Sequence, residues 1–378
     1  MSVDEVVSEA ELVAEADAFA RKAAALAGTE PQLRYQGMPS DGDSRPVYEW
    51  LGRDGWIGLH WSERHGGRGL SHMHTVSCEE RFGYHWLPLS GYLLSVKTVG
   101  NALIRFASEE LTDRLLPEIA AGRLLFCQGF SEPDAGSDLA SLRTRAELHG
   151  DRFVVSGRKI WTSSAEYADW AYLAVRTDPK STGHRGISVL AADMRSPGIT
   201  VTVHETLGGG TLGELDLDQV EIPASQLVGE LHGAWSVLMG TLDYERVTSE
   251  KVGVVMSLLD ALDPLARSSE QRRALQRLRG EAHAARLHGR SAAALLEAGK
   301  PASAQASMAK LSVAQLMQRL AATAAELLGP AAMLEEGTET TRGRVAAFIR
   351  ATVATTIAGG AAEVQRLVIA RRGLGCPT

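Results

Sequence analysis

The chain has 378 residues, of which 44% are hydrophobic and 22% charged, and a formal net charge of −7. This length exceeds what a single-core domain usually needs, so two or three packed units are expected. Basic and acidic residues are interspersed with no basic stripe, so nucleic acid is not expected as a partner, and no apolar run is long enough to span a bilayer.

The N-terminus and the cysteines predict a cytoplasmic location. The first twenty residues are acidic and amphipathic, unlike a secretory signal or an Arg-rich transit peptide. Cys78, Cys127 and Cys376 are scattered, without the spacing of a metal site or a disulfide framework. That pattern fits a reducing compartment.

Residues 1–122 are expected to form a helical domain. Apolar residues within 4–27 recur at alternating steps of four and three, which places them on one helical face. The members of this face are Leu12, Ala16, Phe19, Ala23 and Leu26. Residues 28–46 are rich in Gly, Pro, Asp and Ser and read as a loop. Further helices are expected over 47–56, 75–82, 96–107 and 111–121.

Residues 123–225 are expected to form a small antiparallel β domain. Its strands are predicted from alternating or β-branched runs that turn clusters separate. The predicted strands cover 152–155, 171–176, 186–192, 200–204 and 213–221.

Residues 226–378 are expected to form a C-terminal helical bundle. A helical face starts near Trp235 and continues through Leu259, and Pro264 interrupts it. Further helices are expected over 270–296, 304–328, 344–355 and 362–373. Helices of this length with Leu and Ala faces favour an antiparallel bundle. The predicted fold class is therefore α+β and mainly α, with a helical domain, a small antiparallel sheet and a helical bundle in chain order.

Two segments near the start of the β domain carry the first functional signal. Residues 131–138, SEPDAGSD, form a turn-rich loop whose hydroxyls, amides and Gly136 suit an oxygen-rich ligand. Residues 157–164, GRKIWTSS, place the aromatic plane of Trp161 beside hydroxyl groups, although a Trp in a strand is usually a core residue. In this order and spacing the segments resemble the flavin-binding loops of the acyl-CoA dehydrogenase family, and the resemblance covers nearly the whole chain.

Two later segments extend the resemblance. Residues 356–366, TIAGGAAEVQR, are similar to the family's late Gly-Gly-Thr-Ser-Glu-Ile-Gln signature, with Ala361 where a Thr is usual. Residues 326–330, ELLGP, are similar to a turn that meets the adenine end of a neighbouring subunit's FAD. The Arg-x-x-Phe-Gly run of many members is absent between Pro264 and Leu275. The resemblance implies FAD as the cofactor and a homodimer or homotetramer as the assembly.

Site roles follow from the resemblance position by position. Gln128 and Ser131 would lie along the flavin edge, Trp161 would pack on one face of the ring, and Ser163 would bond near its N5. Asp243 and Arg246 would line the pantetheine channel, and Ser137 would meet the diphosphate or the pantetheine. The other implied cofactor-binding residues are Gln276, Gly329, Gly360 and Glu363.

The implied reaction removes two hydrogens from Cα and Cβ of an acyl thioester. A carboxylate takes the α-proton while the flavin accepts the β-hydride, and a desolvated carboxylate is the stronger base. Many members carry this Glu at the position of Gly359, which cannot act. Other members carry it on the first helix of the C-terminal bundle, where Glu245 falls in the run Leu242–Arg246, so the resemblance implies Glu245 as the base. Glu363 is the competitor, and a surface pairing of Glu245 with Arg246 is the structural alternative.

Several functions stay open at this point. The first is a dehydrogenase of an acyl-CoA or an acyl carrier protein that passes electrons to an electron-transfer flavoprotein. The second is a flavin-dependent monooxygenase on the same fold. The third is a flavin-poor partner subunit of a heteromeric dehydrogenase, which the changes at Gly359 and Ala361 would suit.

Overall fold

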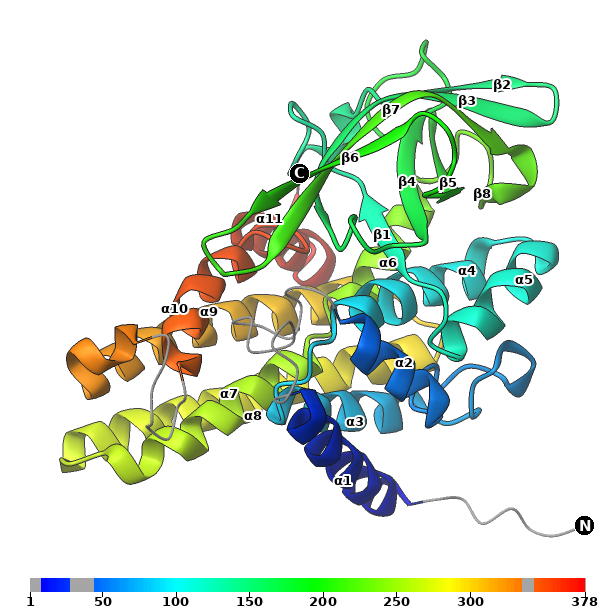
Figure 1. The fold of residues 1–378 in the computed structure, drawn as a ribbon. Helices are drawn as coiled ribbons and strands as arrows, with labels where there is room; N and C mark the ends of the chain where they lie inside the picture. Colours follow the sequence, from blue (N-terminus) through cyan, green and yellow to red (C-terminus); the bar gives the residue numbers. More distant parts are fainter. Residues whose placement is uncertain (1–7, 28–43, 335–342, 378) are drawn as a thin grey trace, which may run out of the picture. The chain divides into compact units, whose positions relative to one another are not determined.

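The computed structural model describes residues 8–27, 44–334 and 343–377 (Figure 1). The start of the helix expected over 4–27 and most of the loop expected over 28–46 lie outside these ranges. Contacts divide the chain into two compact units. The bundle unit comprises Met1–Pro39, Gly69–Leu87 and Arg246–Thr378, and the sheet unit comprises Ser40–Arg68 and Pro88–Glu245. The division into domains at 122 and 225 stays a prediction.

The sheet unit is built on one eight-stranded sheet in the order β6-β7-β3-β2-β4-β5-β8, with β1 paired to β4. Most pairs are antiparallel, while β1 and a single residue of β2 pair with β4 in parallel. The five strands predicted from the sequence are confirmed. The strands are β1 Phe126–Gly129, β2 Arg145–His149, β3 Arg152–Ser163, β4 Trp170–Arg176, β5 Ile187–Asp193, β6 Ile199–Glu205, β7 Thr211–Pro223 and β8 Leu227–Val228.

The helices of the sheet unit differ from the expectation at two places. The segment Tyr92–Gly100, labelled η3, is a π-helix, and only its continuation α4 is α-helical. Helix α6 ends at Glu245, where the sequence predicted a continuous helix through Leu259. The helical segments of this unit are α2 Arg45–Arg53, η2 Glu63–His65, η3 Tyr92–Gly100, α4 Asn101–Phe106, α5 Glu109–Ala120, η4 Leu139–Ser141, η5 Ala224–Gln226 and α6 Trp235–Glu245.

The bundle unit is formed by long helices that run side by side, as Figure 1 shows for α8 and α9. One apolar core joins α7, α8, α9 and α10, with Phe348 and Met317 fully buried in it. The fold class is thus confirmed as mainly helical with an antiparallel sheet. The helical segments are α1 Glu9–Ala27, α3 His72–Tyr84, α7 Ser249–Leu262, η6 Asp263–Leu265, α8 Ser269–Glu297, α9 Ser303–Leu328, η7 Gly329–Met333, α10 Arg344–Thr355, α11 Ala362–Val368 and η8 Ile369–Gly373.

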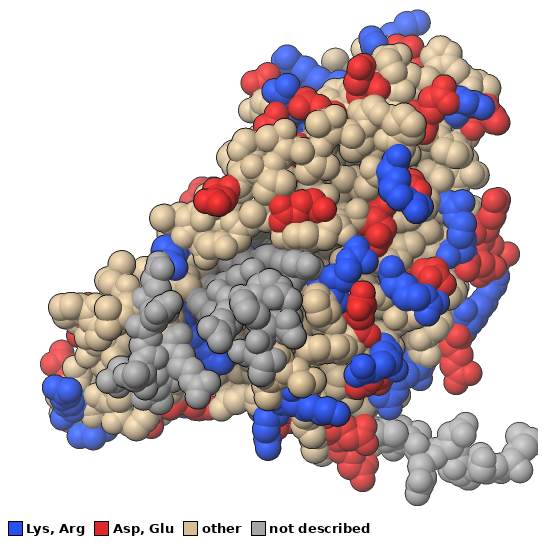
Figure 2. Space-filling model, in the orientation of Figure 1, with Lys and Arg blue, Asp and Glu red and all other residues tan. Residues whose placement is uncertain are grey.

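Charge and hydropathy are distributed as the sequence indicated. Basic and acidic side chains are interspersed on the face drawn in Figure 2. Across the described ranges, no helix combines the length and the apolar character that crossing a bilayer requires.

Helices α3 and α7 pack at the shortest distance that glycines allow. A Cβ on Gly83 would lie 1.8 Å from the carbonyl oxygen of Glu250, and a Cβ on Gly253 would lie 2.0 Å from that of Glu80. These obstacles are backbone atoms, which cannot move aside as a flexible side chain can. Both glycines therefore fix the approach of the two helices.

Helix α1 is held on the bundle by its buried face and by one carboxylate. Leu12, Ala16 and Ala23 are buried as predicted, whereas Leu26 is 45% exposed. Asp17 accepts hydrogen bonds from Arg21, Arg81 and His85. Burial alone would raise the pKa of Asp17, but these three donors lower it to about 2.

We expect Gly253→Ala to destabilise the protein by about 1–3 kcal/mol or more, because the added methyl group overpacks a backbone contact. Gly280→Ala is the matched control on α8, where nothing lies within 4 Å of an added Cβ. That change should stabilise the protein by about 0.5–1 kcal/mol through helix propensity. Urea unfolding would measure the change in the free energy of unfolding for each variant. Equal changes in the two variants would contradict the packing argument.

Asp17→Asn should lower the free energy of unfolding at neutral pH by about 1–3 kcal/mol, because hydrogen bonds to a charged acceptor are lost. In the folded protein the pKa of Asp17 lies below its ordinary value of 3.8. The contribution of ionised Asp17 to the free energy of unfolding is therefore complete above about pH 3.8 and disappears as the pH falls toward about 2. The difference between wild type and variant should therefore narrow below pH ~4. A constant difference across the acid range would rule out this role.

Candidate functional site

In the sheet unit the two glycine- and hydroxyl-rich segments are joined directly. The loop after β1 closes on itself, because Glu132 and Ala135 exchange backbone hydrogen bonds of 2.8 and 3.1 Å. The amide of Ile160 in β3 donates to the carbonyl of Ser131 at 2.9 Å. The loop 131–138 is therefore fixed to the strand that carries Trp161.

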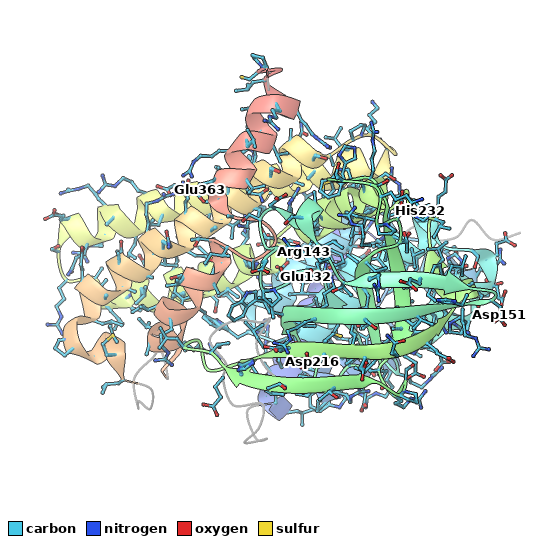
Figure 3. All side chains as sticks on the ribbon, turned by 90° about the horizontal axis from the view of Figure 1, so that it is seen from above. Glu132, Arg143, Asp151, Asp216, His232 and Glu363 are labelled. Carbon is cyan, nitrogen blue, oxygen red and sulfur yellow. The ribbon has the colours of Figure 1, made fainter. Side chains whose placement is uncertain are left out.

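A buried ion pair strengthens this junction. Lys159 is fully buried, and its Nζ donates to Glu132 Oε1 at 2.7 Å and to the carbonyl of Phe130 at 3.1 Å. The amides of Arg143 and Thr144 donate to the same carboxylate at 2.6 and 2.8 Å. Figure 3 shows Glu132 and Arg143 side by side in the sheet unit. Glu132 thus ties together the loop, β2 and β3.

The pKa values of the pair follow from burial and from its donors. Burial lowers the pKa of Lys159 to about 8, against the attraction of Glu132. Burial alone would raise the pKa of Glu132, but the charge and hydrogen bond of Lys159 and the amide donors lower it below its ordinary value. Both groups are charged at neutral pH, as a buried pair with satisfied hydrogen bonds can be.

Trp161 is turned out of the sheet by a β-bulge. Lys159 pairs with Leu215 and Thr162 with Gly213, so two residues of β3 face a single residue of β7. Trp161 takes a φ of 58° and is 64% exposed. A bulge re-aims a side chain in this way, frequently beside an active site. The indole therefore offers an open aromatic face, and the usual reading of a strand Trp as a core residue does not apply.

The polar groups near Trp161 differ in exposure. Gln128, Ser131 and Ser163 are half-buried, while Ser137 is exposed on the loop. An added Cβ on Gly136 would meet nothing within 4 Å, so the loop backbone is open to a ligand at this residue.

Helix α6 presents the predicted base at its last residue. Oε2 of Glu245 is fully buried although the side chain as a whole is half-buried. Asp243 is buried on the same helix, and burial raises the pKa of Tyr244 between them. Tyr172 of β4 and Thr241 of α6 lie 3.4 Å apart through their hydroxyls, which fixes α6 against the sheet.

In the bundle unit the late double-glycine turn is held by three donors. Arg246 Nε donates to the carbonyl of Gly359 at 3.2 Å, and Lys310 Nζ donates to that of Gly360 at 2.6 Å. Gln365 Nε2 donates to both carbonyls, at 3.3 and 3.0 Å. Arg246, predicted to line the pantetheine channel, is therefore engaged with the turn, and its role toward substrate stays a prediction.

The other implied residues of the bundle unit lie at its surface. Gln276 is exposed on α8, and Gly329 is exposed at the end of α9. The side chain of Glu363 is 81% exposed and lies 3.5 Å from Arg366 (Figure 3). A carboxylate that is this well solvated is poorly placed for the role of a desolvated base.

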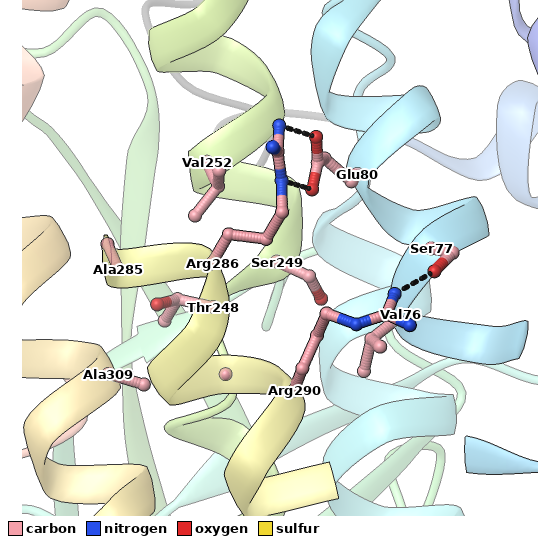
Figure 4. Close-up of a pocket in the computed structure, with 11 residues that line it drawn as sticks. Val76, Ser77, Glu80, Thr248, Ser249, Val252, Ala285, Arg286, Arg290 and Ala309 are labelled. Atoms are coloured by element: carbon pink, nitrogen blue, oxygen red, sulfur yellow. Dashed lines mark hydrogen bonds and ion pairs between the residues drawn. The ribbon is translucent and has the colours of Figure 1, made fainter. Parts of the chain in front are cut away.

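The bundle unit also contains a small cavity between α3, α7 and α8 (Figure 4). Arg286 makes a two-pronged ion pair with Glu80 beside it, and Arg290 donates to Ser77 at 2.8 Å. The cavity volume is about 20 Å³, which is roughly the space of one water molecule. It is too small for a flavin or an acyl chain.

Comparison with known proteins gives the class. Three family models match the chain: "Acyl-CoA dehydrogenase, N-terminal domain" over residues 8–123, the middle domain over 127–220 and the C-terminal domain over 233–374. The chain belongs to the acyl-CoA dehydrogenase family, and is an FAD-dependent oxidoreductase that acts on CH–CH donors.

Individual relatives are similar over most of their length. "Acyl-CoA dehydrogenase FadE26" of Mycobacterium tuberculosis is 34% identical over 354 residues, which cover 88% of each chain. The "Caffeyl-CoA reductase-Etf complex subunit CarC" of Acetobacterium woodii is 29% identical, over 85% of this chain and 88% of the relative. Among solved structures, the "Tcur3481-Tcur3483 steroid ACAD" is 30% identical with a TM-score of 0.87 and covers both chains completely.

The residues of the sheet unit fit a flavin. The exposed indole of Trp161 provides a flat apolar surface for an aromatic ring, and the half-buried Ser163 lies two residues further along β3. Thr162 Oγ1 is buried and, within the described ranges, has no hydrogen-bond partner. The unobstructed backbone at Gly136 leaves room for the polar tail of the cofactor.

Little in the sequence indicates the polar groups that build these segments. Lys159 and Glu132 stand inside the two motifs, but the sequence predicts no role for either, because a strand Lys and a turn Glu usually face solvent. Lys310 on α9 and Gln365 on α11 are not predicted either, because a Lys or Gln on a helix usually faces solvent. The available signal for Lys159 was its position in β3 on the same face as Phe153 and Val155.

We expect Lys159→Met to destabilise the protein by about 3–5 kcal/mol, because Glu132 would be left as an uncompensated buried charge. The double change Lys159→Met with Glu132→Gln removes both charges and should recover a large part of that loss. Thermal and urea unfolding of the single and double variants would measure the coupling. Additive losses would show that the ion pair is not what joins the two segments.

Proposed function

We propose that this protein removes hydrogens from Cα and Cβ of an acyl-CoA thioester, with Glu245 as the base and an electron-transfer flavoprotein as the electron acceptor. One observation carries the proposal. The late position that holds a Glu in many family members is Gly359 here, while Glu245 brings a buried carboxylate oxygen to the end of α6. Glu363 ranks below it, because its side chain is solvated and close to Arg366.

Each group of the chain has a distinct role in this proposal. When bound, FAD supplies the hydride acceptor of the reaction. Trp161 would pack on one face of the ring and Ser163 would donate near N5, while Gln128 and Ser131 would lie along its edge. Gly360 and Glu363 would meet the cofactor from the late turn, and Gln276 and Gly329 would serve the adenine end of a neighbouring subunit's FAD.

The proton transfer is assigned to α6. Glu245 takes the α-proton at Cα of the thioester, and Asp243, Ser137 and Arg246 hold the pantetheine arm. A carboxylate serves as a general base when it lies within hydrogen-bond reach of the proton that it removes. Arg246 steadies the chain directly after the base through its bond to Gly359.

For the acyl group we propose a steroid-like fused-ring acid. The support is the similarity to a solved "steroid ACAD" that covers both chains completely at 30% identity. An acyl carrier protein is the alternative thioester carrier. The electron acceptor is supported by the relative that is named as a subunit of a reductase-Etf complex.

We further propose an oligomer in the cytoplasm, either a homodimer or homotetramer or a heteromer. The ends of the bundle unit expose the large apolar side chains Val353, Ile357, Leu367 and Leu374, as surfaces that partners cover often do. The steroid-type relative is named with two gene products, which favours the heteromeric form. In that form the chain would be one of two unlike subunits.

The flavin-dependent monooxygenase stays an alternative, as does the flavin-poor partner subunit. The buried carboxylate oxygen of Glu245 argues against the monooxygenase, which has no need of this base. The open indole of Trp161 argues against a subunit without flavin. Both alternatives can be distinguished from the dehydrogenase by the flavin absorbance of the purified protein and by its response to an acyl-CoA.

We expect the flavin absorbance of the wild type to bleach on addition of a steroid-type acyl-CoA, and Glu245→Gln to slow bleaching by about 10²–10⁴-fold. The isosteric amide cannot accept the α-proton. Stopped-flow absorbance of the FAD-loaded protein measures this rate. Glu363→Gln tests the competing carboxylate and should slow bleaching much less than Glu245→Gln, because the Glu363 side chain is solvated.

The outcomes separate the alternatives. If Glu363→Gln slows flavin bleaching and Glu245→Gln does not, the base is Glu363 on α11. Bound flavin that no acyl-CoA bleaches would favour a carrier-protein substrate or the monooxygenase. Purified protein without flavin that binds it only with a second gene product would favour the partner-subunit alternative.

A further inference from the structure

The double-glycine turn of the bundle unit has a backbone conformation that other residues rarely adopt. Gly359 has a φ of 68° and Gly360 a φ of 101°. A Cβ on Gly360 would lie 2.5 Å from Gln365 Nε2 and 3.4 Å from Arg246 Nη2. The backbone geometry thus favours glycine at residue 360, and an added Cβ would also push aside the amide group of Gln365.

Lys310 holds this turn from the bundle side. It is 4% exposed on α9, and its Nζ lies 2.6 Å from the carbonyl oxygen of Gly360 and 3.5 Å from that of Thr356. Thr356 is the C-terminal cap of α10, where a positive charge is favourable beside the last carbonyl groups of the helix. One ammonium group therefore connects the end of α10 with the turn.

The donors act on the orientation of the peptide planes. The carbonyl and the amide of one trans peptide point in opposite directions. Since Arg246, Lys310 and Gln365 bind the carbonyls of Gly359 and Gly360, they also fix the directions of the amides of Gly360 and Ala361. Within the described ranges neither amide donates to another backbone carbonyl.

We propose that Lys310 is a positioning residue of the active site, which sets the direction of the Gly360 and Ala361 amides toward a bound oxygen acceptor. This inference rests on the proposed function, because it takes the late turn as part of the flavin site. The acceptor is an oxygen that carries negative or partial negative charge. Both the diphosphate of FAD and the carbonyl of a thioester have this chemistry, and the two sources are distinguished by separate measurements.

Lys310→Met removes the donor and keeps most of the side-chain length. If the amides serve the diphosphate, we expect the dissociation constant of FAD for the apoprotein to rise about 10- to 100-fold, as for a lost hydrogen bond to a charged group. If they serve the thioester, FAD binding should be unchanged, and kcat/KM of the FAD-loaded protein should fall by the same factor, mostly in kcat. Fluorescence titration measures the dissociation constant of FAD, and steady-state kinetics measure kcat and kcat/KM.

Lys300→Met is the matched control, because Lys300 is exposed after the end of α8. It should leave FAD affinity, turnover and thermal stability unchanged. A purely structural role for Lys310 would lower the melting temperature of Lys310→Met while leaving FAD affinity and kcat/KM of the folded protein as in wild type. That result would overturn the proposal.

Gly360→Ala supplies an independent disturbance of the same turn. The double variant combines Lys310→Met with Gly360→Ala. If Lys310 acts through the turn, its FAD affinity or kcat/KM should fall no further than in the worse single variant, whereas the losses from two independent effects multiply. Multiplied losses would overturn the proposal. Failure of the proposed function is distinguishable, because weaker FAD binding in Lys310→Met can be measured even when no acyl-CoA bleaches the wild-type flavin.

Discussion

The buried pair of Lys159 and Glu132 is the interaction on which the candidate cofactor surface depends. Neither group can be removed alone without leaving a charge in the core of the sheet unit. The carboxylate of Glu132 accepts from Lys159 and from two amides at the start of β2. The loop 131–138 is therefore fixed to β3, the strand that carries Trp161.

The bundle unit uses the same principle with different chemistry. Its late turn is held by Arg246, Lys310 and Gln365, which donate to backbone carbonyls instead of to a carboxylate. In both units long polar side chains are buried so that a short loop keeps one conformation. A hydrogen bond to a charged donor contributes more than a neutral one, which suits a segment rich in glycine and high in conformational entropy.

The sequence predicted the helices and the longer strands well, because their periodic apolar patterns extend over many residues. It missed β1 and β8, which are four and two residues long, and β2, whose residues are mostly charged or polar. Strict alternation from Phe153 and Val155 would place Trp161 in the core. The register shift after Lys159 reverses this, and a bulge leaves no periodic signal in the chain. The partner of a buried Lys is equally invisible, since Glu132 lies 27 residues away.

The end of α6 at Glu245 is compatible with the proposal that this residue is the base in a chain with glycine at residue 359. In the continuous helix expected from the sequence, Glu245 and Arg246 would project from one rigid cylinder. Because the helix ends at Glu245, Arg246 is released from the helical direction and binds the Gly359 carbonyl. The late turn thus anchors Arg246, the residue that follows Glu245, through the carbonyl of Gly359. Glycine at residue 359 is compatible with this hydrogen bond, because the bond uses only the backbone carbonyl.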